Sequence, residues 1–352
     1  MNRCCVKLLP LMFLSTLPMW ATAQTYTPLV LGGLNQDIIA EATTAMAHTS
    51  SSVDSNGAIA TVLFSDSFPH PSSQVGLPNN GLLSAASGGA SFTYQLAAFN
   101  GNNALVTPAG QTKTTTLAAP TALSNLSLLV FATEQSKNAI YTLTFDDGST
   151  SVKPVTVVND WYSSAAARIS GYGRVVRNND TDFTKQTNQK YFGNELKLTC
   201  AEQKKKLSSI TLEAQDITPN NLNGNVVLLA ASGVAADVDA GAISGASTLG
   251  VAQSAVLSNP IPGGSWTSSD TAIATVDATT GKVTAVAPGS VTITYTLPGS
   301  CSTPARHNIT INAAPITPPA PKAVPSLSEW FVIALSCLLA TLGVSLIRRR
   351  RC

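Results

Sequence analysis

The chain has 352 residues, of which 44% are hydrophobic and only 11% are charged. That apolar content is ample for a packed core, so disorder along the whole chain is excluded. The formal net charge is +2, but without Arg3, Lys7, Glu329 and residues 348–351 the remainder holds 15 basic and 18 acidic side chains, a net charge near −3. Nucleic-acid binding needs a basic footprint, so nucleic acid is excluded as a partner.

The first 23 residues have the three parts of a secretion signal. Arg3 and Lys7 form the basic start, an apolar run extends from Leu8 to Trp20, and Ala21-Thr22-Ala23 is a small-x-small cleavage pattern. Thirteen apolar residues interrupted by prolines are too few to span a bilayer. We predict a signal peptide over residues 1–23, cleaved by signal peptidase after Ala23, and therefore export across an inner membrane.

Residues 25–232 are predicted to form an antiparallel β-sandwich. In Ala139–Phe145 the residues Tyr141, Leu143 and Phe145 share one face, a turn follows at Asp146–Ser149, and residues 152–158 return, which predicts a hairpin. Further strands are predicted at 125–133, 194–199, 207–213 and 226–231. Only residues 35–47 have a helical pattern.

Short segments of this region resemble a jelly-roll domain of secreted, surface-sorted bacterial proteins. The segments that carry the resemblance are Tyr26-Thr27-Pro28, Gly33–Ile39, Leu77–Gly81, Thr144–Ser149 and Asp160-Trp161-Tyr162. The resemblance implies a jelly-roll-like sandwich over 25–232. Related jelly rolls include carbohydrate-binding modules, so it also implies polysaccharide as a candidate partner.

Several aromatic residues lie close together in sequence between positions 161 and 192. Pyranose faces stack on aromatic rings, so these residues are candidates for sugar contacts. Trp161, Tyr162 and Tyr172 are the candidate glycan contacts, with Arg168 and Arg174 as candidate hydrogen-bond donors. Aromatic residues beside strands are more often part of the core, and that alternative stays open.

The sequence gives little sign of catalytic or metal chemistry. The three histidines, His48, His70 and His307, do not stand at metal-binding spacing, and no nucleophile or phosphate-loop motif is present. We therefore predict no catalytic residue and no cofactor. The polar run Asn178–Asp182 is a candidate structural calcium site, with a solvated loop as the alternative. A glycoside hydrolase remains an open alternative, since its two acids can come from distant strands.

Residues 240–313 are predicted to form a second, smaller β-sandwich. Val291, Ile293 and Tyr295 alternate with threonines as in a half-buried strand, Gly281 lies in a turn, and Trp266 is the expected core anchor. The run from Ser265 to Tyr295 resembles the group 2 bacterial immunoglobulin-like domain, which implies a spacer or stalk module.

Two of the six cysteines, Cys200 and Cys301, lie outside the two termini. Because they fall in different predicted domains, no disulfide within a domain is expected, and they cannot form a metal cluster.

The C-terminus consists of a Pro-rich spacer at 314–323, the sequence Val324-Pro325-Ser326-Leu327-Ser328-Glu329-Trp330, an uncharged stretch over 330–347, and four arginines. The length and the flanking charge of that stretch predict a transmembrane helix whose C-terminus stays in the cytoplasm.

This layout resembles the IPTL-type, PEP-CTERM-like sorting signal of Gram-negative bacteria, with Val324 in place of Ile and Ser326 in place of Thr. The resemblance implies processing by an exosortase-type membrane protease. A permanent single-pass anchor is the alternative.

Taken together, the sequence predicts an all-β protein with a C-terminal transmembrane helix. It is expected to be a membrane-anchored precursor that becomes a non-catalytic surface or extracellular-matrix protein. A carbohydrate-binding or adhesin module is the first alternative, and a glycoside hydrolase is the second.

Overall fold

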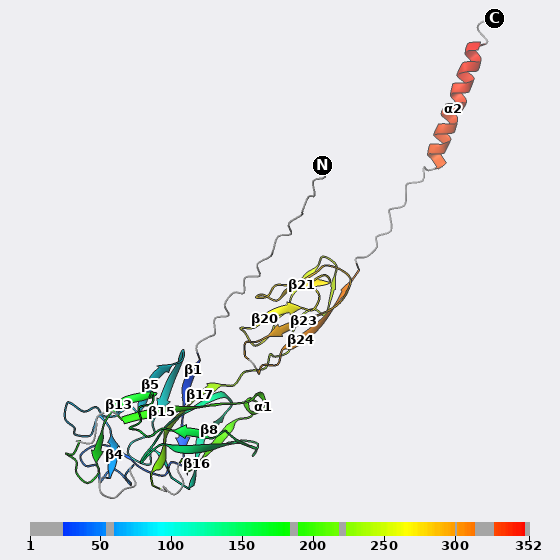
Figure 1. The fold of residues 1–352 in the computed structure, drawn as a ribbon. Coiled ribbons are helices and arrows are strands. Elements are labelled where there is room, and N and C mark those ends of the chain that lie inside the picture. The colour runs from blue at the N-terminus through cyan, green and yellow to red at the C-terminus, as the bar shows by residue number, and fades with distance from the viewer. Residues whose placement is uncertain are drawn as a thin grey trace, which may run out of the picture. The chain divides into compact units, whose positions relative to one another are not determined.

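The computed structural model describes residues 24–53, 60–183, 189–217, 223–299, 301–313 and 327–348, and in the last range it describes side chains at 330–341. The chain is mostly β-sheet, as predicted. It divides into two compact units (Figure 1). Unit 1 comprises residues 1–241 and 296–304, and unit 2 comprises 242–295 and 305–352. The short segment 296–304, which the sequence placed in the second domain, therefore belongs to unit 1.

Unit 1 is built around a large, mainly antiparallel sheet. In spatial order its strands are β13 (Ile169–Tyr172), β15 (Gln189–Lys197), β9 (Leu123–Ala132), β17 (Asn225–Ala235), β1 (Thr25–Leu29), β6 (Ala90–Gln95) and β5 (Leu82–Ser87), and β7 (Leu105–Pro108) also pairs with β17. The pairing of β1 with β6 is parallel.

Two further sheets complete unit 1. The second sheet consists of β11 (Thr150–Val152), β10 (Lys137–Phe145), β16 (Leu207–Asp216), β8 (Thr112–Thr121) and β2 (Leu31–Gly32), with β12 (Thr156–Val158) also paired to β10. The third consists of β14 (Arg174–Val176), β4 (Thr61–Phe64) and β3 (Ile39–Ala40). The predicted hairpin is present, but its returning arm is divided into β11 and β12, on either side of Pro154.

Strand β9 explains how the layers are held together, because it is buried on both faces. Its even-numbered residues Leu126, Leu128 and Val130 pack in one hydrophobic cluster with Tyr141 and Leu143 of β10. Leu129 and Phe131, on the opposite face, pack in a second cluster with Tyr94, Trp161 and Tyr191. Each cluster removes a continuous apolar surface from water, which is the main stabilising contribution in such a fold.

The helix predicted over residues 35–47 is not found. Residues 39–40 form β3 and the rest of the segment is irregular, with Ile38, Ile39 and Ala40 fully buried. The apolar residues of this segment pair and pack against β4, and this tertiary contact decides the local structure. Unit 1 instead contains the short helix α1 (Cys200–Gln203).

Unit 2 contains two small sheets. One consists of β18 (Thr248–Gly250), β24 (Ala305–Asn312), β23 (Gly289–Thr296) and β20 (Ser265–Ser268), and the other of β19 (Ser254–Val256), β22 (Lys282–Ala285) and β21 (Ala274–Val276). Val291, Ile293 and Tyr295 are buried on one face of β23, and Trp266 is buried with its ring centroid 4.6 Å from that of Tyr295. The predicted strand alternation and the predicted core tryptophan are thus confirmed.

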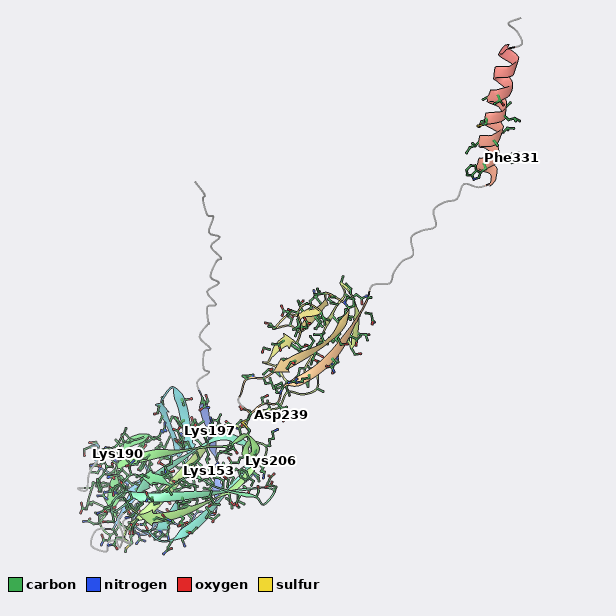
Figure 2. The ribbon with its side chains drawn as sticks, turned by 45° about the vertical axis from the view of Figure 1, so that its right-hand side comes forward. Lys153, Lys190, Lys197, Lys206, Asp239 and Phe331 are labelled. Carbon is green, nitrogen blue, oxygen red and sulfur yellow. A yellow bond between two sulfur atoms is a disulfide. The ribbon has the colours of Figure 1, made fainter. Side chains whose placement is uncertain are left out.

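The C-terminal helix α2 spans Leu327–Arg348 and contains all of the predicted stretch 330–347. Its described side chains are exposed, Phe331 among them (Figure 2). In the part of the chain that the structure describes, no helix reaches the length and apolarity needed to cross a membrane, so the predicted transmembrane helix is not found.

Candidate functional site

The three aromatic residues predicted to contact glycan differ in exposure, although the rings of Trp161 and Tyr162 lie 5.8 Å apart between centroids. Trp161 is only 1% exposed, its ring stacks on Phe131 at 5.0 Å between centroids, and the Arg174 guanidinium lies 4.9 Å from it. A pyranose cannot reach that ring. This corrects the expectation for Trp161, which is a core residue because it fills the space beside β9. Tyr162, by contrast, is 43% exposed.

Tyr172 and the two candidate donors are also partly engaged in packing. The ring of Tyr172 stacks on Tyr191 at 6.4 Å, and burial raises the pKa of the Tyr172 hydroxyl. Arg168 lies over the ring of Phe92 and pairs with Glu195. The Arg174 guanidinium lies 4.9 Å from the ring centroid of Tyr162. A glycan contact through Tyr162 and Tyr172 stays a prediction.

A different part of unit 1 forms a hollow of about 440 Å³ with an aromatic and polar lining, here called the aromatic hollow. Its lining residues are Thr43, Phe68, Pro69, His70, Pro71, Asp180, Thr181 and Phe183. Phe64, beneath them on β4, contacts His70 at 5.1 Å and Phe183 at 5.5 Å between ring centroids. Phe68 is buried, while His70 and Phe183 are partly exposed, so these two present ring surface at the hollow.

Local sequence explains why His70 is held in this position. Pro69 and Pro71 flank it, and each proline fixes its own φ and restricts the residue before it. The Nδ1 atom of His70 lies 3.1 Å from the carbonyl oxygen of Pro71. No site residue was predicted in this loop, although Phe68-Pro69-His70-Pro71 is a local signal of a rigid aromatic segment.

The candidate calcium run Asn178–Asp182 borders the aromatic hollow, and several of its side-chain oxygens are occupied by hydrogen bonds. Asp180 Oδ1 accepts from the Ala45 backbone N–H at 2.8 Å, and Asn179 Oδ1 accepts from the Thr181 hydroxyl at 3.0 Å. Among the residues that the structure describes, no cluster of His, Cys, Asp and Glu could hold a metal ion. The run thus forms a hydrogen-bonded turn in one wall of the hollow, and a calcium site there stays a prediction.

A second hollow of about 370 Å³ is lined by Asp37, Glu41, Ala47, His48, Thr49, Ser50 and Asn100, and is here called the acidic hollow. Burial raises the pKa of both carboxyls, and the charge of Asp37 raises that of Glu41 further. His48 Nδ1 lies 3.7 Å from Glu41 Oε1, and Asn103 donates to Asp37 at 2.6 Å. The acidic hollow thus brings together two carboxyls and an imidazole from the segment 37–48, which includes β3.

Cys200 and Cys301 form a disulfide, with their Cα atoms 5.0 Å apart. The expectation of no disulfide within a domain was wrong, because Cys301 lies in the segment 296–304, which belongs to unit 1 together with Cys200. Hydrogen bonds fix that segment further. The Cys301 N–H donates to Asp237 at 2.9 Å, and the Thr303 N–H donates to Asp239 at 2.7 Å.

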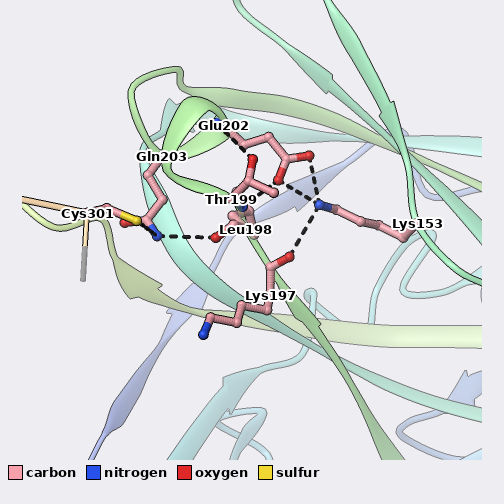
Figure 3. A network of polar contacts seen from close by, with 7 residues as sticks. All are labelled: Lys153, Lys197, Leu198, Thr199, Glu202, Gln203 and Cys301. Carbon is pink, nitrogen blue, oxygen red and sulfur yellow. Dashed lines mark hydrogen bonds and ion pairs between the residues drawn. The ribbon is translucent and has the colours of Figure 1, made fainter. Parts of the chain in front are cut away.

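Cys200 is the first residue of α1, and a network of polar contacts surrounds that helix. Figure 3 shows its members Thr199, Glu202 and Gln203 beside Cys301. Thr199 and Glu202 form a capping box, which satisfies free N–H groups at the start of the helix. Gln203 donates to the carbonyl oxygen of Leu198 at 3.2 Å and contacts the Cys301 sulfur at 3.1 Å.

Lys153 completes this network, because its Nζ donates to both carboxylate oxygens of Glu202 at 2.8 Å and to the carbonyl oxygen of Lys197 at 3.3 Å. Burial acts to raise the pKa of Glu202, but hydrogen bonds from Lys153, Ser151 and Thr199 outweigh it and lower that pKa to about 2. The pair is therefore a charged, fully hydrogen-bonded ion pair. Lys190 lies well away from Lys153 in unit 1 (Figure 2).

Most of the predicted processing sites lie outside the described residues. These are the signal peptide with Ala21 and Ala23, the spacer 314–323, and Val324, Pro325 and Ser326 of the sorting motif. Leu327, Ser328, Glu329 and Trp330 form the first turn of α2, and Trp330 is 59% exposed.

Two parts of the chain match known protein families. Residues 255–299 match the bacterial Ig-like domain (group 2), and residues 322–351 match the IPTL-CTERM motif. The chain carries both modules. No sequence among the curated proteins matches it.

Two solved structures are similar to parts of the fold. One is the M60 catalytic domain with the CBM51-1 and CBM51-2 domains of Clostridium perfringens ZmpB, at 9% identity and a TM-score of 0.19, covering 66% of this chain. This chain spans only 20% of that structure's length. The other is the adhesin domain of Epf from Streptococcus pyogenes, at 10% identity and a TM-score of 0.23, covering 81% of this chain and 99% of the other. At these TM-scores neither structure informs the function.

Proposed function

We propose that this chain is an exported, non-catalytic surface or extracellular protein that is released through its C-terminal sorting motif. The observation that carries the proposal is the IPTL-CTERM motif at residues 322–351. Such a motif implies processing by an exosortase-like enzyme. Signal peptidase would act first, at Ala23, and the group 2 Ig-like module would serve as a spacer between the tail and unit 1.

The mass of the mature protein tests this proposal. In the native host, the mature protein should begin at Gln24 and should lack residues 348–351. Deleting the exosortase gene should leave the full tail in place, whereas the control variant Thr317→Ala, in the spacer before residue 322, should be processed normally. A surface-located protein that retains residues 348–351 in the wild-type host would contradict processing and would favour a permanent anchor.

A second candidate function is glycan binding by unit 1, and the aromatic hollow is the specific observation that favours it. Sugar sites combine aromatic ring surface with a few polar groups that fix orientation. The hollow offers the rings of His70 and Phe183 beside Asp180 and Thr181. Its position on loops, held by a sheet beneath, is the usual arrangement for a binding site.

Polysaccharide binding by the full mature protein tests this second candidate. Phe183→Ala should abolish binding without changing the circular dichroism spectrum, while Tyr162→Ala, an exposed aromatic elsewhere in unit 1, should leave it unchanged. Loss of binding in Tyr162→Ala alone would place the contact at the residues chosen from sequence instead. Absence of binding to any polysaccharide would contradict the candidate function.

The acidic hollow provides the test of the non-catalytic part of the proposal. A glycosidase needs two carboxyls, one of which acts as an acid. If Asp37 and Glu41 had that role, the mature protein would hydrolyse a polysaccharide and Glu41→Gln would abolish the activity. We expect no hydrolysis by either protein.

A further inference from the structure

Lys137 and Asp216 form an unusually buried pair in the second sheet of unit 1. They are directly opposite each other in the antiparallel register of β10 and β16. Lys137 Nζ lies 2.8 Å from Asp216 Oδ1, and the two side chains are 1% and 9% exposed. Lysine and aspartate are rarely buried to this degree, because removing their charges from water is costly.

The surroundings of Asp216 differ from those of Glu202, the other carboxylate that meets a buried lysine. Glu202 accepts hydrogen bonds from Lys153 and from the Thr199 backbone N–H at the capped helix end. Both oxygens of Asp216 are buried, and within the described part of the chain neither has a hydrogen-bond partner of good geometry. The Asp216 carboxyl is therefore held against the Lys137 amine without the hydrogen bonds that stabilise a buried carboxylate.

We propose that Lys137 and Asp216 are the site of an intramolecular amide crosslink between β10 and β16. Transfer of one proton along the Nζ–Oδ1 contact gives a neutral amine and a carboxylic acid. The Nζ lone pair then attacks Cγ of Asp216, and the carbon–hydroxyl bond breaks. One amine proton stays on the amide nitrogen, the other joins the hydroxyl, and one water leaves. No oxidant or external reactant is needed.

The strand register favours this condensation. It holds the amine against the carboxyl, and such fixed proximity replaces a bimolecular encounter by an intramolecular step.

Mass spectrometry of the reduced, denatured mature protein tests the crosslink. The wild-type protein should be lighter than its sequence mass by one water, about 18 Da, after correction for its termini and for the reduced cysteines. A protease digest should contain a branched peptide that joins Lys137 to Asp216. Lys137→Arg, whose guanidinium keeps the charge and does not condense, should have the full sequence mass and no branched peptide.

Two controls separate the crosslink from other losses of water. Lys153→Arg alters the other buried lysine–carboxylate pair and should keep the deficit of about 18 Da. Asp147-Gly148 is a sequence that can lose water by forming a succinimide, so a deficit located there, or one that persists in Lys137→Arg, overturns the proposal. A wild-type protein at its full sequence mass also overturns it, and this measurement does not depend on whether any variant folds.

Discussion

Removal of the Cys200–Cys301 disulfide should destabilise the protein strongly. The bond closes a chain segment with a sequence separation of 101 residues. Loop-closure entropy assigns roughly 4.7 kcal/mol to a loop of about 100 residues, on the assumption that the bond does not strain the folded state. The hydrogen bonds at Asp237 and Asp239 keep the segment 296–304 close to unit 1 only in the folded state, so they do not replace this constraint on the unfolded chain. We expect the double variant Cys200→Ser/Cys301→Ser to lose about 3–5 kcal/mol of unfolding free energy.

Urea unfolding of the mature protein, followed by tryptophan fluorescence and circular dichroism, measures this loss. A reductant provides the matched control, because it should lower the stability of the wild-type protein and leave the double variant unchanged. Limited proteolysis provides a second measurement, since cleavage within 296–304 should be faster in the double variant. If the double variant unfolds within about 0.5 kcal/mol of wild type, the bond constrains the unfolded chain far less than loop-closure entropy requires, and this reasoning fails.

Three further outcomes are expected. Trp161→Ala should lower the free energy of unfolding by about 3–5 kcal/mol, as for other large core aromatics. Tyr162→Ala should lower it by less than about 1 kcal/mol. Equal losses in chemical denaturation would show that Trp161 is not a core residue. The pKa of Glu202 is about 2 in the folded protein against an ordinary 4.5, so its contribution is fully present above pH 4.5 and disappears as the pH falls towards 2. Glu202→Gln should therefore flatten the fall in Tm over that range, and an unchanged pH profile would contradict the assigned ion pair. Gly281 has φ +69°, and an added Cβ would lie 2.9 Å from the ring of Trp266. Gly281→Ala should therefore lower the unfolding free energy of unit 2 by at least about 1 kcal/mol. The unfolding of unit 1 should stay unchanged.

The strands that could be predicted from sequence are those whose pattern is local. The alternation of Tyr141, Leu143 and Phe145 identified β10, and the apolar runs at 125–133 and 226–231 identified β9 and β17. The segment 35–47 was mistaken for a helix because its periodicity is local while its packing is not. Ile39 and Ala40 pair in parallel with Leu63 and Phe64, more than twenty positions further along the chain.

The aromatic hollow could be predicted only in part, for a similar reason. Its walls come from three segments, at 43, at 68–71 and at 180–183, and only the second has a distinctive sequence. Trp161 shows the opposite error. Its position beside Tyr162 and a charged residue is typical of an exposed binding surface, but the ring is covered by Phe131 and Arg174 from other elements. Exposure of an aromatic ring is a tertiary property and does not follow from its neighbours in sequence.

The disulfide also bears on where the protein folds. Disulfides persist mainly in oxidising compartments outside the cytosol. The Cys200–Cys301 bond lies in the body of the chain, so it is independent of the two terminal signals that predict export. No disulfide within a domain was expected, because each predicted domain was treated as one continuous stretch of sequence. The segment 296–304 contradicts that assumption. It belongs to unit 1, although the residues before and after it belong to unit 2. The Cys200–Cys301 disulfide was not expected from the predicted domain order. It nevertheless supports folding outside the cytosol, which is also what the sorting motif implies.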